Sequence, residues 1–335
     1  TLSLHDALPI SHKPRAGSMQ FWPRKRAKRI YPRVRSWPVL KEATPLGFAG
    51  YKVGMTHITI IDHRKSGKAK TGGELTLPVT IVECPPLKIL SILFYKLDNK
   101  NWLMKKEVMF KADKEVGRKL KLPKNTGSLD NINLEDYDDV RMKVYTQPKL
   151  ASVGKKKPEV FELCVGGTKE EKFQYVKDNI GKEIKVTDVF KPGQELDFHA
   201  ITTGKGFQGP VKRFGVSLRN HKSEKVIRGP GSLGSWCGQG HMMYRVAHAG
   251  QMGFHTRTEY NKWLLKISDK PEEVNPKGGF VGSGSVKTDY ILVKGSLGGP
   301  KKRLLRFNFA TRSRGKSPKE APSIEFVSLK SQQSK

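Results

Sequence analysis

Three groups of residues in this chain have types and spacing that could support a specific chemistry. Residues 204–209, with the sequence GKGFQG, match G-x-G-x-x-G, the pattern of loops that bind dinucleotides. Cys237 and His241 could form a thiol nucleophile and its base. The same two residues, together with His248 and His255, could instead bind zinc.

The surroundings of these residues argue against all three sites. Pro210 and a basic run follow the glycine loop where a Rossmann unit would begin its helix. The cysteine and the histidines lack the close ligand pairs of a zinc knuckle, and no oxyanion hole or orienting carboxylate can be identified for the thiol. We therefore expect no catalytic residue, no metal and no cofactor. The glycines instead let the backbone approach a phosphate closely.

The stretch 201–262, which contains these residues, is too basic and too rich in glycine to fold by itself. It holds ten Lys and Arg against two acids, with eleven glycines. Such a segment buries too little apolar surface to offset its chain entropy. Because the whole chain carries a formal charge of +32 over 335 residues, we expect RNA phosphates to order this stretch.

Trp236 stands in the middle of this stretch, among glycines and serine and without apolar neighbours in sequence. A tryptophan at a loop tip can stack on a nucleic-acid base, which contributes about 1–3 kcal/mol. We favour this interpretation; packing of Trp236 against its own domain is the alternative.

Residues 12–43 are predicted to form a basic N-terminal arm. Ten basic residues and no acid lie between Lys13 and Lys41, and four prolines prevent a long helix. Four aromatic side chains that suit base stacking are interspersed with the charges: Phe21, Trp22, Tyr31 and Trp37. We expect the arm to contact RNA; a solvated, disordered tail is the alternative.

The rest of the chain divides by composition. We expect a split β-barrel domain over 44–85 and 183–312, in which 203–262 form the basic loop, and a basic C-terminal tail over 313–335. Residues 86–182 hold fourteen acids and 21 basic residues, so we expect an inserted α/β subdomain that is less engaged with nucleic acid. Residues 1–11 carry no Lys or Arg and begin without Met, and we expect an artefact or a tag there.

Sequence periodicity predicts the elements that must position the basic loops. Runs rich in β-branched and alternating apolar residues predict strands at 48–60, 78–82, 89–95, 140–145, 160–165, 195–201, 263–267, 286–293 and 302–309. Thr168 and Glu171 form a capping box before a helix over 169–180, and Gly181 ends it. On that helix, Phe173, Val176 and Ile180 share an apolar face.

Membrane and secreted classes are disfavoured. No apolar run approaches 18 residues, and no long amphipathic helix indicates binding to a lipid surface. The three separated cysteines cannot build a disulfide framework, which favours a reducing, cytoplasmic location.

Several motifs in the same order resemble the family of ribosomal large-subunit protein three, in its archaeal and eukaryotic form. They are FAGYKVGMT at 48–56, KGFQG at 205–209, the run from Gly250 to Lys262, PKGGF at 276–280, and the basic runs at 23–29 and 35–38. The resemblance covers about residues 12–312. It implies an α+β protein with a translation-protein type β-barrel, an inserted α/β subdomain and long basic extensions.

The resemblance also implies a function. Members of the family bind large-subunit rRNA early in assembly, contact neighbouring ribosomal proteins, and extend a loop toward the peptidyl-transferase centre, near the path of tRNA accommodation. Trp236 matches the tryptophan of that loop, and His221 corresponds to one of its histidines. After Trp236 the family has a proline-containing turn, which the run WCGQGH at 236–241 lacks.

These arguments predict a non-enzymatic rRNA-binding protein of the cytoplasmic ribosome, with no small-molecule substrate. An RNA-modifying enzyme and a free translation factor with a similar barrel are the alternatives. The residues expected to contact rRNA are Lys13, Arg15, Arg24, Lys25, Arg26, Lys28, Arg29, Arg33, Arg35, Trp37, Lys205, Phe207, Gln208, Lys212, Arg213, His221, Lys222, Trp236, His241, Arg245, Gln251, His255, Arg257, Asn261, Lys262, Lys301, Lys302 and Arg303.

Overall fold

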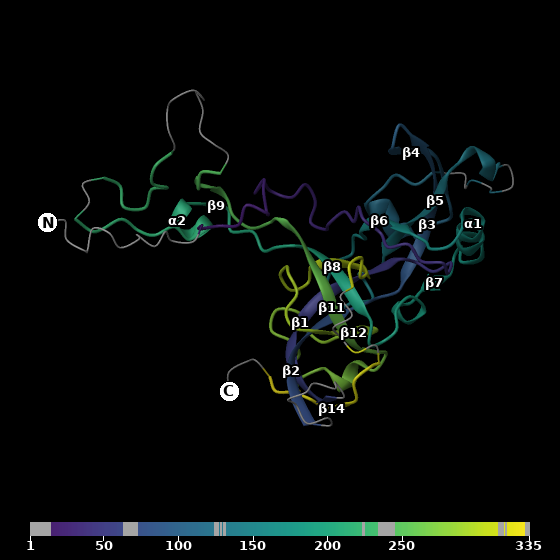
Figure 1. Ribbon diagram of the computed structural model, residues 1–335. Helices are drawn as coiled ribbons and strands as arrows, with labels where there is room; N and C mark the ends of the chain where they lie inside the picture. The colour runs from purple at the N-terminus through teal and green to yellow at the C-terminus, as the bar shows by residue number, and fades with distance from the viewer. Residues whose placement is uncertain are drawn as a thin grey trace. The chain divides into compact units, whose positions relative to one another are not determined.

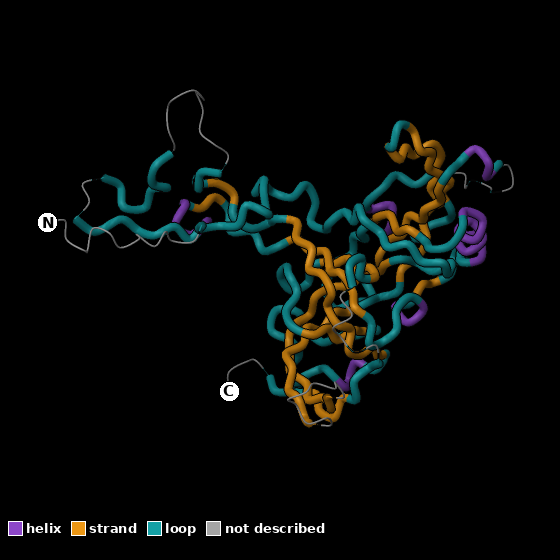
Figure 2. Tube along the Cα trace, in the orientation of Figure 1, coloured by secondary structure: helices purple, strands orange, loops and turns teal. Residues whose placement is uncertain are grey.

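The computed structural model of the chain describes residues 15–62, 73–123, 127, 129, 132–222, 225–233, 245–313, 318 and 320–331 (Figure 1). The chain divides into two compact units. The extension unit comprises the chain up to Lys28 and Thr202–His255, and the sheet unit comprises Arg29–Ile201 and the chain from Thr256 onward. The fold is α+β and consists mostly of β-sheet with few helices (Figure 2).

The larger sheet of the sheet unit has seven strands in the order β13-β8-β11-β12-β2-β1-β14. β13 also pairs with β1, so the antiparallel pairings run through six strands and return to β13. The strands are β1 (Gly47–Asp62), β2 (Gly73–Glu83), β8 (Glu195–Ile201), β11 (Thr256–Ser268), β12 (Tyr290–Lys294), β13 (Leu304–Phe309) and β14 (Ile324–Val327).

Alternating apolar side chains form the core of this sheet. On β8, Leu196, Phe198 and Ala200 are buried, as the alternating pattern predicts. The Phe198 ring stacks on Phe307 of β13 with the ring centres 5.0 Å apart, and Phe190 lies 5.5 Å from the same ring. Burying such aromatic side chains supplies most of the apolar area that stabilises a core of this kind.

A second sheet lies within residues 87–184. Its main path is β4-β3-β5-β6, and β7 pairs with β3. The strands are β3 (Leu87–Asp98), β4 (Asn101–Met109), β5 (Asp139–Thr146), β6 (Val160–Cys164) and β7 (Glu183–Ile184). The described part of the sheet unit also has 3-10 helices at Lys114–Arg118, Leu134–Asp136, Val186–Asp188 and Pro271–Glu273.

The helix α1 (Lys169–Asp178) covers part of this second sheet. The predicted capping box is present: Glu171 N donates to the Thr168 hydroxyl, and Thr168 N donates to the Glu171 carboxylate at 2.8 Å. Val176 is buried, and the Phe173 ring centre lies 6.2 Å from that of Phe94 on β3. The apolar face expected from the sequence is therefore the face that packs.

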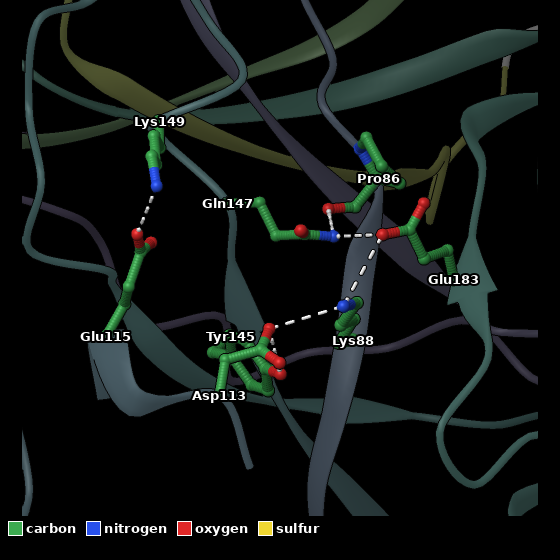
Figure 3. A network of polar contacts seen from close by, with 8 residues as sticks. All are labelled: Pro86, Lys88, Asp113, Glu115, Tyr145, Gln147, Lys149 and Glu183. Atoms are coloured by element: carbon green, nitrogen blue, oxygen red, sulfur yellow. Dashed lines mark hydrogen bonds and ion pairs between the residues drawn. The ribbon is translucent and has the colours of Figure 1, made fainter. Parts of the chain in front are cut away.

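A polar network joins β3 to the segments around it (Figure 3). The Lys88 ammonium lies 3.2 Å from Asp113 and 3.6 Å from Glu183. The Tyr145 hydroxyl donates to Asp113 at 2.9 Å, and the Gln147 amide donates to Glu183 at 2.9 Å. Each partner is partly solvated, so the network orients these segments more than it stabilises them.

In the described residues of the extension unit, the regular elements are short. β9 (Phe207–Gln208) pairs with β10 (Gly250–Gln251), and α2 (Pro210–Phe214) follows β9. The expectation that a helix would not follow the glycine loop was therefore wrong. Pro at the first helical position favours helix initiation, and Gly215, with φ of 71°, ends the helix after five residues. The β9–β10 pair is antiparallel, unlike the parallel pair of a Rossmann unit.

Most predicted strands are present, with shifted ends. The run expected at 286–293 becomes a strand only from Tyr290, and β4, β14 and α2 were not predicted. β14 lies in the segment predicted to be a basic tail, and it pairs with β1 from Ile58 to Ile60. Among the described residues, no helix is both long enough and apolar enough to span a membrane.

Candidate RNA interface

The two ends of the segment 202–255 run antiparallel and form a stem within the extension unit. Thr202 N donates to His255 O at 3.0 Å, and Lys205 N donates to Met252 O at 2.9 Å. Gly253, with φ of 70°, lies against the Thr203 carbonyl, where a Cβ atom would collide. The stem is therefore ordered by its own backbone, although its sequence suggested that only an external partner could order it.

Part of the basic arm is attached to this stem. Ala27 N donates to Phe254 O at 2.8 Å, and Nδ1 of the buried His255 lies 2.9 Å from Lys25 O. The guanidinium of Arg26 lies 5.5 Å from the Phe254 ring centre, within cation–π range. These contacts fix the backbone of 25–27 while its basic side chains stay exposed.

A cluster of two arginines and two aromatic rings holds the arm beside α2. Arg24 lies 4.2 Å from the centre of the Phe214 ring, and Trp22 stacks on the same ring at 5.7 Å. One Arg24 nitrogen donates to Arg213 O at 3.0 Å. Trp22 therefore packs inside the unit, although the sequence suggested that this ring would stack on a base.

Arg213 connects three segments of the extension unit. Its guanidinium donates to His248 O at 2.7 Å, to Gln251 O at 3.0 Å and to Arg24 O at 3.3 Å. Burial lowers the pKa of Arg213, and the adjacent positive charge of Arg24 lowers it further. Burial and the charge of Arg15 likewise lower the pKa of Arg24. Both arginines thus bridge backbone carbonyls of the unit, and their phosphate contacts stay a prediction.

Two glutamines of the predicted set also make internal bonds. The Gln208 amide donates to Lys205 O at 2.7 Å, and the Gln251 amide donates to Met252 O and to Gly253 O. These bonds shape the glycine-rich turns of the stem. They leave Phe207, between Lys205 and Gln208, with 77% of its side chain exposed.

The second half of the arm belongs to the sheet unit. Tyr31 is buried, and its hydroxyl donates to Val160 O at 2.9 Å. Trp37 is half-buried against the core, and the guanidinium of Arg306 lies 5.8 Å from its ring centre. Arg29, Arg33 and Arg35 are exposed. Tyr31 thus packs within the sheet unit, whereas the sequence suggested that its ring would stack on a base.

Most of the remaining predicted residues of the sheet unit have defined protein partners. Lys262 Nζ lies 2.8 Å from Glu259 and donates to Ser296 O at 2.9 Å. Arg303 donates to Ile201 O, and Lys301 Nζ donates to Val281 O at 2.6 Å. The other contacts link Asn261 to Asp197 and Arg312, and Arg257 to Thr256. Lys302, with φ of 65°, is exposed at a turn.

Comparison with known proteins identifies the family. A family model described as "Ribosomal protein L3" matches residues 9–334, which is nearly the whole chain. The chain belongs to the ribosomal protein L3 family. It is 45% identical over 334 residues to the large ribosomal subunit protein uL3 of Methanothermobacter thermautotrophicus, covering 96% of this chain and 98% of that protein.

Other archaeal members of the L3 family are similarly close. The uL3 protein of Methanosphaera stadtmanae is 47% identical over 334 residues, and that of Archaeoglobus fulgidus is 44% identical over 329 residues. Each comparison covers 96% of this chain and 98% of the relative. The resemblance inferred from the motifs is confirmed. An RNA-modifying enzyme is not supported, because the family is one of ribosomal proteins.

With the L3 family identified, the predicted residues of the extension unit fall into an engaged and an exposed group. Arg24, Arg213, Gln208, Gln251 and His255 make the internal bonds described above. The exposed group is Arg15, Lys25, Arg26, Lys28, Lys205, Phe207, Lys212, His221, Lys222 and Arg245. Two of its members also make internal contacts, because Arg15 donates to Arg245 O at 2.5 Å and Arg26 lies over the Phe254 ring. In this L3-family unit, Arg24 and Arg213 bridge backbone carbonyls, because the planar guanidinium can donate to several acceptors at once.

Three of the residues that this L3-family chain was predicted to use for rRNA contacts lie outside the described residues: Lys13, Trp236 and His241. Cys237, of the possible zinc or thiol site, also lies outside them. Within the described ranges, no group of three or more His, Cys, Asp and Glu is placed to hold a metal. Three further cations of the loop 203–262 are exposed but were not predicted to contact rRNA: Arg219, Lys225 and Arg228. They are among the ten basic residues counted in the stretch 201–262.

Proposed function

We propose that this chain is a structural constituent of the large subunit of cytoplasmic ribosomes, that it binds large-subunit rRNA, and that it performs no catalysis. The observation that carries this proposal is membership of the L3 family over residues 9–334, with archaeal relatives named as large ribosomal subunit proteins. The exposed cations of the arm and stem support it, because RNA affinity depends first on phosphate neutralisation.

We further propose that the six strands whose pairings return to β13 form a barrel of the translation-protein type. The ring of antiparallel pairings supports this assignment. The domain boundaries follow from it: a barrel over 44–85 and 183–312, an inserted subdomain over 86–182, a basic arm over 12–43 and a tail over 313–335. The separate sheet formed by β3 to β6 supports the insertion, and its additional strand β7 lies directly after residue 182.

The predicted rRNA-binding residues take two roles in this proposal. The exposed group neutralises phosphates, and Phe207 offers a ring on which a base can stack. The engaged group, represented by Arg213 and His255, holds the stem and arm in the shape that presents the exposed group. We also propose the rRNA contacts inferred from the sequence for Lys13, Trp236 and His241.

The finer parts of the function rest on the family. We propose that the chain joins the rRNA early in assembly, contacts neighbouring ribosomal proteins, and extends the loop containing Trp236 toward the peptidyl-transferase centre. In this position the loop would act on tRNA accommodation indirectly. The antiparallel stem at 202–208 and 250–255 supports this proposal, because it brings both ends of that loop together.

The salt dependence of RNA binding tests the proposed phosphate contacts. Each phosphate neutralised should lower log K by about 0.7–0.9 per log unit of salt. Contacts with roughly six to ten phosphates should therefore weaken binding of the full chain to its rRNA fragment about 10³–10⁵-fold between roughly 50 and 200 mM salt. An affinity that barely changes over this range would contradict the proposal.

A further inference from the structure

The hairpin formed by β3 and β4 ends in an exposed sheet edge. β4 is the last strand on its side of the second sheet within the described part of the chain, and Figure 1 shows it at the periphery of that sheet. Residues 101–106 of β4 are all exposed. An exposed edge strand presents a row of backbone donors and acceptors, and proteins usually cover or protect such an edge.

One face of this hairpin is apolar. Leu97 pairs directly with Trp102, and Tyr95 pairs with Met104, so the four side chains lie on the same face. Tyr95 is buried at the base of the hairpin, whereas Leu97, Trp102 and Met104 have 47%, 46% and 51% of their surface exposed. Large apolar side chains that adjoin one another at the surface indicate a contact with another molecule.

Arg141 fixes the orientation of the aromatic rings. Its guanidinium lies 4.3 Å from the Tyr95 ring centre and 5.7 Å from the Trp102 ring centre. The Arg141 Nε donates to the Asp139 carboxylate at 3.0 Å, and Lys172 Nζ donates to the same carboxylate at 2.7 Å. The exposed Trp102 ring is therefore held by a chain of polar contacts and loses little freedom when a partner covers it.

The chemistry of this face fits a protein better than RNA. Aromatic residues, Met and Arg are the types enriched at the centres of protein interfaces. Leu97 and Met104 can neither stack on a base nor donate to a phosphate, and nucleic-acid interfaces are polar and strongly charged. Four exposed lysines of the hairpin lie outside this face: Lys100 in the turn, Lys105 at the register shift, and Lys96 and Lys106 on the opposite face by strand alternation.

We propose that the β3–β4 hairpin is a docking site for an extended, acidic segment of a second protein, which adds a strand to β4. The backbone of β4 would supply the pairing, the apolar face would receive the partner's apolar side chains, and the exposed lysines of the turn and the opposite face would attract its acids. A second copy of this chain does not fit, because the hairpin lysines and the +32 formal charge would repel their equivalents. If the proposed function holds, the partner is a neighbouring large-subunit protein.

A site-specific crosslink in purified large subunits tests this docking site. The full chain would carry a photo-reactive phenylalanine derivative at position 104, with a control derivative at Leu150, which is 42% exposed and outside the hairpin. We expect the crosslink from position 104, but not from position 150, to reach an acidic, extended segment of a single protein. A crosslink to rRNA alone, or no crosslink, would overturn the proposal.

A matched substitution gives the second readout. Trp102→Glu with Met104→Glu should lower the amount of the crosslinked protein in salt-washed subunits at least about tenfold, because the acids remove apolar contact and repel an acidic segment. Leu150→Glu should leave that amount unchanged, and Met104→Gln should give a smaller loss in the same direction.

An unchanged protein content in the double variant would overturn the proposal. The presence of the chain itself in subunits is measured separately. Loss of the chain from subunits contradicts the proposed function, whereas loss of the partner alone supports the docking site.

Discussion

The guanidinium of Arg306 lies 4.4 Å from the centre of the Phe161 ring, in the interior of the sheet unit. Its nitrogens donate to Glu162 O at 2.5 Å and to Pro32 O at 3.3 Å. Burial lowers the pKa of Arg306 to about 9, and the nearby Glu162 opposes this shift. Arg306 thus connects β13, β6 and the second half of the arm through one buried cation.

Replacing Arg306 tests whether this contact holds the arm. Arg306→Ala leaves two buried carbonyls without their donor, and we expect the free energy of unfolding to fall by about 2–4 kcal/mol. Arg306→Lys keeps a charge but loses the planar fork, so it should cost about 1–2 kcal/mol. Urea unfolding measures both changes. Tryptic cleavage at Arg33 and Arg35 should accelerate in the alanine variant, and an unchanged cleavage rate would contradict this account.

His199 should make stability depend on pH. Its Nε2 lies 2.7 Å from Asn308 Oδ1 and its Nδ1 lies 3.0 Å from the Thr258 hydroxyl, an arrangement that suits the neutral ring. Burial lowers the pKa of His199 below its usual value near 6.5, although the bond to Asn308 opposes this. As the pH falls below about 6.5, the unfolded chain therefore binds the proton first and the folded state loses stability.

The pH effect can be isolated by comparing the chain with His199→Gln. The difference in unfolding free energy between the two proteins should be constant above about pH 7 and should shrink as the pH falls through 6.5. Denaturant unfolding at several pH values measures it. A difference that stays constant down to pH 5, or that grows on acidification, would show that His199 is not held neutral.

Two phenylalanines in the extension unit should respond oppositely to substitution. Phe207 is 77% exposed, so Phe207→Ala should leave folding unchanged and weaken binding to the rRNA fragment by about 1–3 kcal/mol. Phe214 is buried beneath Trp22 and Arg24, so Phe214→Ala should destabilise the unit by about 3–5 kcal/mol. Fluorescence titration and protease resistance measure the two effects. Equal RNA affinity of the Phe207 variant and the unchanged chain would exclude the stacking role.

Lys212 and Arg213 are adjacent in sequence but should have different functions. Lys212 is exposed, and Lys212→Ala should reduce the salt dependence of RNA binding by about one phosphate contact without affecting stability. Arg213→Ala removes donors to three backbone carbonyls and should expose the stem to proteolysis. If both variants changed only the salt dependence, Arg213 would be a phosphate ligand and its bridging role would be excluded.

Local patterns were sufficient to predict many of the regular elements. The alternation of Leu196, Phe198 and Ala200 predicted β8 with its observed ends, and the Thr168–Glu171 pair predicted the start of α1. In both cases the sequence pattern spans only a few residues, although β8 pairs with β11 and β13 from distant parts of the chain. By contrast, β14 forms because β1, from a distant part of the chain, presents an edge with which it pairs. The polar sequence around β14 did not indicate a strand.

The roles of the basic residues could not be predicted in this way. Positive charge alone does not distinguish Lys212 from Arg213, because the difference arises when loop closure brings the carbonyls of His248 and Gln251 to Arg213. The same is true of Tyr31, which is buried because β6 presents the Val160 carbonyl to its hydroxyl. Charge density predicted an RNA-binding class of protein, while tertiary contacts decided which cations remain available.

Sedimentation with large ribosomal subunits tests the central claim most directly. Cells expressing the tagged full chain would be lysed, and their large subunits would be washed in high salt before the chain is quantified by mass spectrometry. We expect one copy of the chain per subunit after the wash, because a constituent enclosed by rRNA exchanges slowly. Release of the chain into the supernatant, or recovery well below one copy per subunit, would contradict its assignment as a structural constituent.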